Sequence, residues 1–340
     1  MSSTTASNPF LTDLLAQPAA LHDAVTHFDP ALLADLHIEK YERIVITAMG
    51  GSHFAGVPAW LSLVRAGLPA WHIDASELLH DAAGLVNERT LLWMVSQSGR
   101  SAEIVARLDK VRPAHLLALT NDAASPLAQR ADRVQFMHAG VEAVVSTKTY
   151  LNTLALTQLM ALQMAGLPTD GARAELHDAA DAVGAYLAEY EQRQHNLGAR
   201  VGVPQRLFLL GRGASMAAVD AGALVLKEAA KINATGMSGP QFRHGPFEMA
   251  DERVTALVLA GEGATVDLQK RLVADLRGIG AAALLVGSGA DADLPHPSAT
   301  GAGLPIAEIL PFQLLTFPIC AATGFVAGQF RHSTKVTTAL

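Results

Sequence analysis

The sequence is short of cysteine and of clustered positive charge, and each shortage excludes a class of protein. Its one cysteine, Cys320, can form neither an intramolecular disulfide nor a multi-thiolate metal site, which favours a reducing compartment. The net charge is −7 and no stretch concentrates lysine and arginine, so the electrostatic footprint of nucleic-acid binding is missing. The opening segment MSSTTASNPF lacks the basic and then apolar profile of a secretory signal. We therefore expect a cytoplasmic protein without a nucleic-acid partner.

One uncharged run, residues 309–330, is long enough in principle to cross a bilayer. It contains residues that break or polarise a helix, namely Pro311, Gln313, Pro318, Gly324 and Gln329. These residues fit a buried helix with breaks better than a lipid-facing span. We expect no membrane helix here.

The chain has 340 residues, half of them hydrophobic, which suffices for two globular units of about 150 residues and excludes general disorder. Short apolar runs recur, each followed by a small-residue turn and a helical pattern, as in parallel βαβ units. We predict strands over residues 44–49, 70–75, 91–96, 115–120 and 134–138, and again over 206–210, 254–260 and 282–287. Helices are predicted over residues 148–165, 172–195, 215–232 and 306–325.

The two halves resemble a degenerate repeat. ITAMGGS near residue 50 parallels LFLLGRGAS near residue 211, and WMVSQSGRS parallels ALVLAGEGAT. The sequence therefore predicts an α/β fold of two tandem doubly wound parallel-sheet domains, with ligand sites at the carboxyl ends of the strands. The expected division is an N-terminal helical segment (1–43), a phosphate-binding domain (44–198), and a second domain with a C-terminal closing segment (199–340).

A hydroxyl-rich turn, SQSGRS at residues 96–101, ends one predicted strand and opens a helical segment. Ser96, Gln97, Ser98 and Ser101 can supply several short donors from one direction, as a phosphate group requires. An ordinary helix N-cap explains the same serines equally well. A second turn, containing Ser52, follows another strand and could add a hydroxyl from the side.

Other motif interpretations fail. A nucleophile elbow needs glycine where Phe54 stands, and a dinucleotide fingerprint needs glycine at Met216. A triphosphate-binding GxxxxGK[ST] loop and the metal-binding HExxH spacing are both missing from the sequence. We therefore expect neither a cofactor nor a metal ion.

The ordered motifs resemble those of the sugar isomerase (SIS) family, specifically its tandem two-domain members such as the isomerase half of glucosamine-6-phosphate synthase and phosphosugar deaminases. They span about residues 44–338 and are AMGGSHFAG, ASE at 75–77, VSQSGRSAE, VVSTKTY at 144–150, LFLLGRGAS, ALVLKE ending at Glu228, FRHGPFEM around His244, LPFQLLTFP, and KVT beginning at Lys335. The resemblance implies a flavodoxin-like, SIS-type fold for both domains.

The resemblance also implies the residues of the site. Phosphate would be bound by Ser52, Ser96, Gln97, Ser98 and Ser101, with Gly51 and the backbone of residues 144–146, including Ser146, lining the sugar. Glu228 would move a proton between sugar carbons 1 and 2, His244 would assist ring opening, and Lys335 would close over the open-chain sugar. The implied assembly is a homodimer in which His244 reaches the site of the neighbouring subunit.

These roles make chemical sense, because aldose–ketose isomerisation needs one base that takes and returns a proton, and partial burial brings a carboxyl pKa towards neutrality. On the residues alone, Glu228 can also be a solvated charge beside Lys227, His244 a structural loop residue and Lys335 a tail residue. Val225 and Gln241 depart from the synthase pattern, and the amidotransferase half is missing from the chain.

Three hypotheses follow. The first is a phosphosugar isomerase acting on an amino- or ketosamine hexose 6-phosphate, with deamination or deglycation as the net result. The second is a non-catalytic protein that binds and senses a sugar phosphate. The third is a structural role in which the serine turn is only a helix cap.

Overall fold

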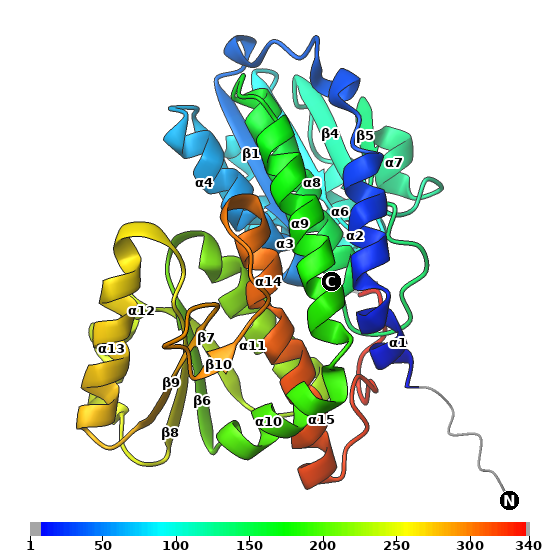
Figure 1. Ribbon diagram of the computed structural model, residues 1–340. Coiled ribbons are helices and arrows are strands. Elements are labelled where there is room, and N and C mark those ends of the chain that lie inside the picture. Colours follow the sequence, from blue (N-terminus) through cyan, green and yellow to red (C-terminus); the bar gives the residue numbers. More distant parts are fainter. Residues whose placement is uncertain (1–7, 338–340) are drawn as a thin grey trace, which may run out of the picture.

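The computed structural model describes residues 8–337 as two five-stranded, fully parallel sheets with helices between and around them (Figure 1). Residues 1–7 and 338–340, which belong to the expected terminal segments, lie outside the described residues. The first sheet has the order β2-β1-β3-β4-β5 and the second has the order β10-β9-β8-β6-β7. Numbered within its own domain, the second sheet has the same 2-1-3-4-5 order, which confirms the predicted tandem of doubly wound domains.

The strands end where the small-residue turns begin, as the sequence predicts. The first sheet consists of β1 (Arg43–Ala48), β2 (Ala70–Asp74), β3 (Thr90–Val95), β4 (His115–Thr120) and β5 (Arg133–Phe136). The second consists of β6 (Arg206–Gly211), β7 (Ala234–Ser238), β8 (Val254–Leu259), β9 (Ala282–Gly287) and β10 (Leu294–Pro295). The sequence analysis missed β7 and β10, because ATGMS and a two-residue edge strand carry no apolar run.

The helices fall where predicted, except that two long ones are broken. The expected 172–195 helix is two helices, α9 (Asp170–Leu187) and α10 (Tyr190–Val201), and the closing helix is α14 (Leu304–Glu308) followed by α15 (Leu310–Thr323). The others are α1 (Pro9–Leu15), α2 (Gln17–Thr26), α3 (Gly50–Ala55), α4 (Val57–Arg65), α5 (Ala75–His80), α6 (Ala102–Leu108), α7 (Pro126–Arg130), α8 (Lys148–Met164), α11 (Met216–Ala230), α12 (Gly239–Arg243) and α13 (Val266–Gly278).

One apolar core joins the two domains. It extends from the inner faces of both sheets through α8, α11 and α15, and α2 packs beside α8 and α9 (Figure 1). Gly222 lets α11 approach α15 closely, since a Cβ at this position would collide with Phe312. The helical stretch Gly301–Thr323 is long and apolar enough to span a membrane, but 83% of its apolar window is buried in this core. It is therefore a core helix, as the sequence predicted.

Candidate active site

A cavity of about 320 Å³ opens between the carboxyl ends of β1 and β3. In a sheet of order 2-1-3-4-5, this is the point where the chain reverses its winding direction and where ligands of such folds bind. Its lining includes nine residues singled out from the sequence, which are Gly51, Ser52, Ser96, Gln97, Ser98, Ser101, Ser146, Glu228 and Lys335. Folding thus gathers the predicted phosphate donors, base and lysine in one place.

The serine turn is shaped by Gly99. This residue has φ +59°, and a Cβ on it would collide with the side chain of Ser125, so the turn requires glycine. Its amide donates to Ser96 Oγ at 3.1 Å, and the two hydroxyls of Ser96 and Ser101 lie 3.5 Å apart. The neighbouring Arg100 instead forms an ion pair with Asp122 at 2.9 Å. The turn therefore contributes hydroxyl and amide groups to the cavity, while its guanidinium is held elsewhere.

Glu228 lies at the end of α11, half-buried, on the wall of the same cavity. Burial raises the pKa of its carboxyl group, and the nearby Lys335, Lys231 and Lys227 partly offset this effect. A raised pKa brings the carboxyl closer to a state in which it can both accept and return a proton near neutral pH. A smaller cavity of about 20 Å³ lies beside Glu228, with Tyr150 and Gln313 in its lining.

The loop from residue 138 to 147 forms another wall, and it is organised by Glu142, which the sequence analysis did not single out. The buried carboxylate of Glu142 accepts hydrogen bonds from the backbone amides of Thr147 (2.8 Å) and Thr149 (3.1 Å) and from both threonine hydroxyls. Lys335 donates to Glu142 and to the carbonyl of Val144. A carboxylate just before the STKT helix start is the signal that could have identified Glu142.

The C-terminal segment covers the cavity. Residues 333–337 contribute to its lining, and the carbonyl of Thr337 accepts from the amide of Ala102 at 3.1 Å. That amide begins α6, directly after the serine turn. In this structure the protein's own C-terminal segment accepts from it, and the amides of Ser96, Gly99 and Arg100 donate within the protein, which leaves mainly the serine hydroxyls and the amides of Gln97, Ser98 and Ser101 for a ligand.

His244 lies apart from this cavity. It is exposed at the end of α12, and it does not occur among the described residues that line the cavity of its own chain. The equivalent turns of the second domain are occupied by internal hydrogen bonds. Ser215 Oγ donates to Glu308 Oε1 at 2.8 Å, and Glu262 Oε2 accepts from the amide of Gly301 at 3.1 Å.

Comparison with known proteins relates the first domain to one family by sequence. Residues 37–163 match the family model of the SIS domain. The chain is 29% identical to glutamine–fructose-6-phosphate aminotransferase (isomerizing) from Methanothermobacter thermautotrophicus, in a match that covers 96% of this chain and 57% of that protein. The chain thus spans little more than half the length of this curated relative.

Solved structures share the fold over nearly the whole chain. The C-terminal domain of glucosamine-fructose-6-phosphate aminotransferase from Francisella tularensis superposes with a TM-score of 0.85 at 22% identity, covering 97% of this chain and 99% of the other. Glucosamine-6-phosphate deaminase from Thermotoga maritima gives a TM-score of 0.78 at 19% identity, with coverages of 96% and 99%. Both superpositions include the second domain, which the family model does not reach.

Proposed function

We propose that this chain, in which residues 37–163 match the SIS domain, is an enzyme that isomerises an amino- or ketosamine-type hexose 6-phosphate by proton transfer between carbons 1 and 2. The observation that supports this best is that Glu228, a half-buried carboxyl group with a raised pKa, lines the same cavity as the serine turn and Lys335. A base, a cation and a set of anion donors around one cavity form the minimum apparatus for this reaction.

In the proposed mechanism, the hydroxyls of Ser52, Ser96, Ser98 and Ser101, with the Gln97 amide, bind the phosphate group. With the phosphate held at one end, the length of the sugar would place carbons 1 and 2 beside the Glu228 carboxyl group. The Glu228 carboxylate removes the proton from one carbon and returns it to the other, while the C–C double bond of the enediol or enamine forms and is consumed. The ammonium of Lys335 stabilises the negative charge that develops on the sugar oxygen.

For a 2-amino aldose, proton transfer gives a 2-imino ketose. Water then adds to carbon 2 and ammonia leaves, so the net reaction is amino-hexose 6-phosphate plus water to ketohexose 6-phosphate plus ammonia. For a ketosamine, the same transfer in the opposite direction gives an imine at carbon 1, and its hydrolysis releases the amine. The proposal includes a homodimer in which His244 of one subunit serves ring opening in the other.

The test starts with a thermal-shift panel of glucosamine 6-phosphate, fructose 6-phosphate and other hexose and amino-hexose 6-phosphates, followed by assays of isomerisation and ammonia release. A true ligand at saturation should stabilise the fold by several kcal/mol. Glu228→Gln should keep that stabilisation and lower kcat by roughly 10²- to 10⁴-fold. Glu252→Gln, at an exposed position distant from the cavity, is the matched control.

Full turnover in Glu228→Gln would refute the mechanism. Ligand stabilisation of the unchanged protein without turnover on any compound of the panel would favour a sensing function instead. If none of the compounds stabilised the protein, the serine turn would be a structural cap.

A further inference from the structure

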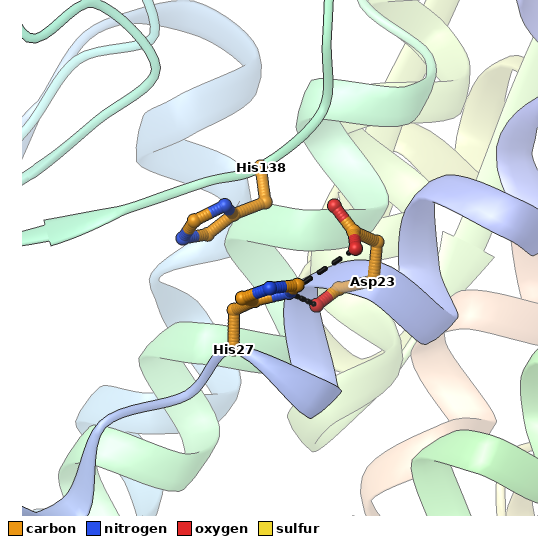
Figure 2. Close-up of side chains that lie close together, drawn as sticks. All are labelled: Asp23, His27 and His138. Carbon is orange, nitrogen blue, oxygen red and sulfur yellow. Dashed lines mark hydrogen bonds and ion pairs between the residues drawn. The ribbon is translucent and has the colours of Figure 1, made fainter.

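A second cluster of chemically active side chains lies outside the catalytic cavity, where α2 meets the end of β5. Figure 2 shows Asp23 and His27, one turn apart at the end of α2, facing His138, which follows β5. One potential ligand atom from each residue lies within 4.8 Å of the other two. His138 is 111 positions from His27 and 115 from Asp23 along the chain, so only tertiary folding brings it to them.

The backbone around the cluster is held from both sides. The Asn152 side chain donates to the carbonyl of Ala20 on α2 at 2.9 Å and to that of Met137 at 2.8 Å. The Gln135 side chain joins β5 to the residues just after α2, because its oxygen accepts from the amide of Asp29. The cluster is therefore built on two segments whose relative position is fixed by other, buried groups.

The ring of His138 is directed at α2. His138 has φ +52°, one of two non-glycine residues with positive φ in the described chain, and its ring stacks on that of His27 with centroids 4.6 Å apart. His27 Nδ1 lies 2.9 Å from the backbone carbonyl oxygen of Asp23 and 3.1 Å from Asp23 Oδ1, so Nε2 is the ring atom of His27 without these contacts. Burial and the neighbouring His27 lower the pKa of His138, whereas Asp23 raises it.

We propose that Asp23, His27 and His138 bind a divalent transition-metal ion of the Zn²⁺ type. Two imidazoles and one carboxylate are ligands that suit Zn²⁺, Co²⁺ and Ni²⁺, whereas Mg²⁺ and Ca²⁺ prefer oxygen ligands alone. A tetrahedral ion with ligand bonds of about 2.0–2.1 Å requires ligand atoms about 3.4 Å apart. The side chains would have to rotate from their present positions, in which the ligand atoms lie within 4.8 Å of one another, and water would complete the coordination.

The position of the site gives the ion a structural role. It would connect the N-terminal helix α2 to the first residue of the 138–147 loop, whose residues 144–146 line the catalytic cavity. Binding to the folded state alone stabilises it, so the ion should raise the melting temperature and restrain that loop. The site lies outside the cavity, and no catalytic step depends on it.

The experiment uses the full chain without a histidine tag, stripped with a chelator, and titrated with Zn²⁺ by calorimetry and with Co²⁺ by visible absorption. We expect one ion per chain, Co²⁺ bands of a four-coordinate site, and a higher melting temperature with Zn²⁺. His27→Ala and His138→Asn should each weaken binding by roughly tenfold or more. Asparagine tolerates positive φ, so His138→Asn preserves the local backbone.

His177→Ala is the matched control. His177 belongs to the other histidine pair of this face, in which its Nδ1 lies 2.9 Å from His22 Nδ1. This variant should bind Zn²⁺ as the unchanged protein does. The proposal is overturned if the protein binds no ion, or if His177→Ala loses binding while His138→Asn keeps it. Since none of these measurements uses a sugar phosphate, the result is independent of the proposed enzymatic function.

Discussion

Glu308 is a second carboxyl group with a raised pKa, but it lies outside the catalytic cavity. It is fully buried and accepts a hydrogen bond from Ser215, and burial raises its pKa to about 8. Below the ordinary carboxyl pKa, Glu308 is protonated in both the folded and the unfolded chain, so its ionisation does not reduce the free energy of unfolding. As the pH rises towards 8, only the unfolded chain releases the proton, and the free energy of unfolding falls.

We predict that Glu308→Gln becomes progressively more stable than the unchanged protein as the pH rises from 5 to 8. Glutamine keeps the acceptor for Ser215 but does not ionise in the unfolded state. By pH 8 the free energy of unfolding of Glu308→Gln, relative to that of the unchanged protein, should have risen by on the order of 2 kcal/mol. Loss of one proton can change this difference by at most about 1.4 kcal/mol per pH unit. Melting temperatures of both proteins at several pH values measure it. A difference independent of pH would show that Glu308 ionises normally in the fold.

At the scale of elements, both ends of the chain hold the 138–147 loop. On one side, Asp13 of α1 forms an ion pair with Lys148 at 2.9 Å and accepts from the amide of Ala143 at 2.8 Å. On the other side, the ammonium group of Lys335 donates a hydrogen bond to the carboxylate of Glu142 and forms an ion pair with it. The Asp13–Lys148 pair is nine-tenths buried, with side-chain exposures of 7% and 10%. Helix α1 and the C-terminal segment therefore both help to shape the loop that lines the site.

We predict that Asp13→Ala lowers stability by about 3 kcal/mol, because it leaves the buried Lys148 without a counter-charge. It should also raise KM several-fold with a smaller effect on kcat, since the loop lines the cavity without supplying the base. Thermal unfolding and steady-state kinetics measure both. Asp291→Ala, which removes the exposed pair with Lys270, should cost less than about 1 kcal/mol. Equal losses in the two variants would contradict the role of Asp13.

At the scale of the whole molecule, His244 lies apart from the cavity that holds Glu228. In one chain it is exposed at the end of α12 and does not line the cavity. In the dimer that we propose, His244 would reach the partner's site. A symmetric dimer with shared sites has a specific consequence, because two different inactive chains can together form one complete site.

We predict that Glu228→Gln and His244→Ala, each inactive alone, regain activity when they are co-expressed or reassociated. Half of the randomly formed dimers would be mixed, and each mixed dimer would have one intact site of two, giving about one quarter of the full activity. Kinetics of the mixture and its mass by light scattering measure this. A mixture no more active than its components would show that His244 does not act across subunits.

The sequence determined the fold and most of the candidate site because both depend on local signals. Apolar runs that end in small-residue turns define eight of the strands, and in parallel sheets such turns meet at one edge. For this reason the sequence predicts that SQSGRS and Ser52 lie near one another, whereas the place of Glu228 beside them was implied only by the resemblance to the SIS family. The predicted tandem SIS-type architecture is confirmed, and the residue roles stay predictions.

Only the tertiary structure decided which distant polar groups meet. The residues around Glu142 do not indicate that Lys335 will donate a hydrogen bond to it. Nor does the local sequence indicate that the carbonyl of Thr337 will accept one from the amide of Ala102. The same holds for His27 and His138, whose rings stack across a gap of more than a hundred residues. Hydrophobic periodicity is a property of neighbours along the chain, whereas hydrogen bonds and ligand sets depend on how the packed elements place side chains in space.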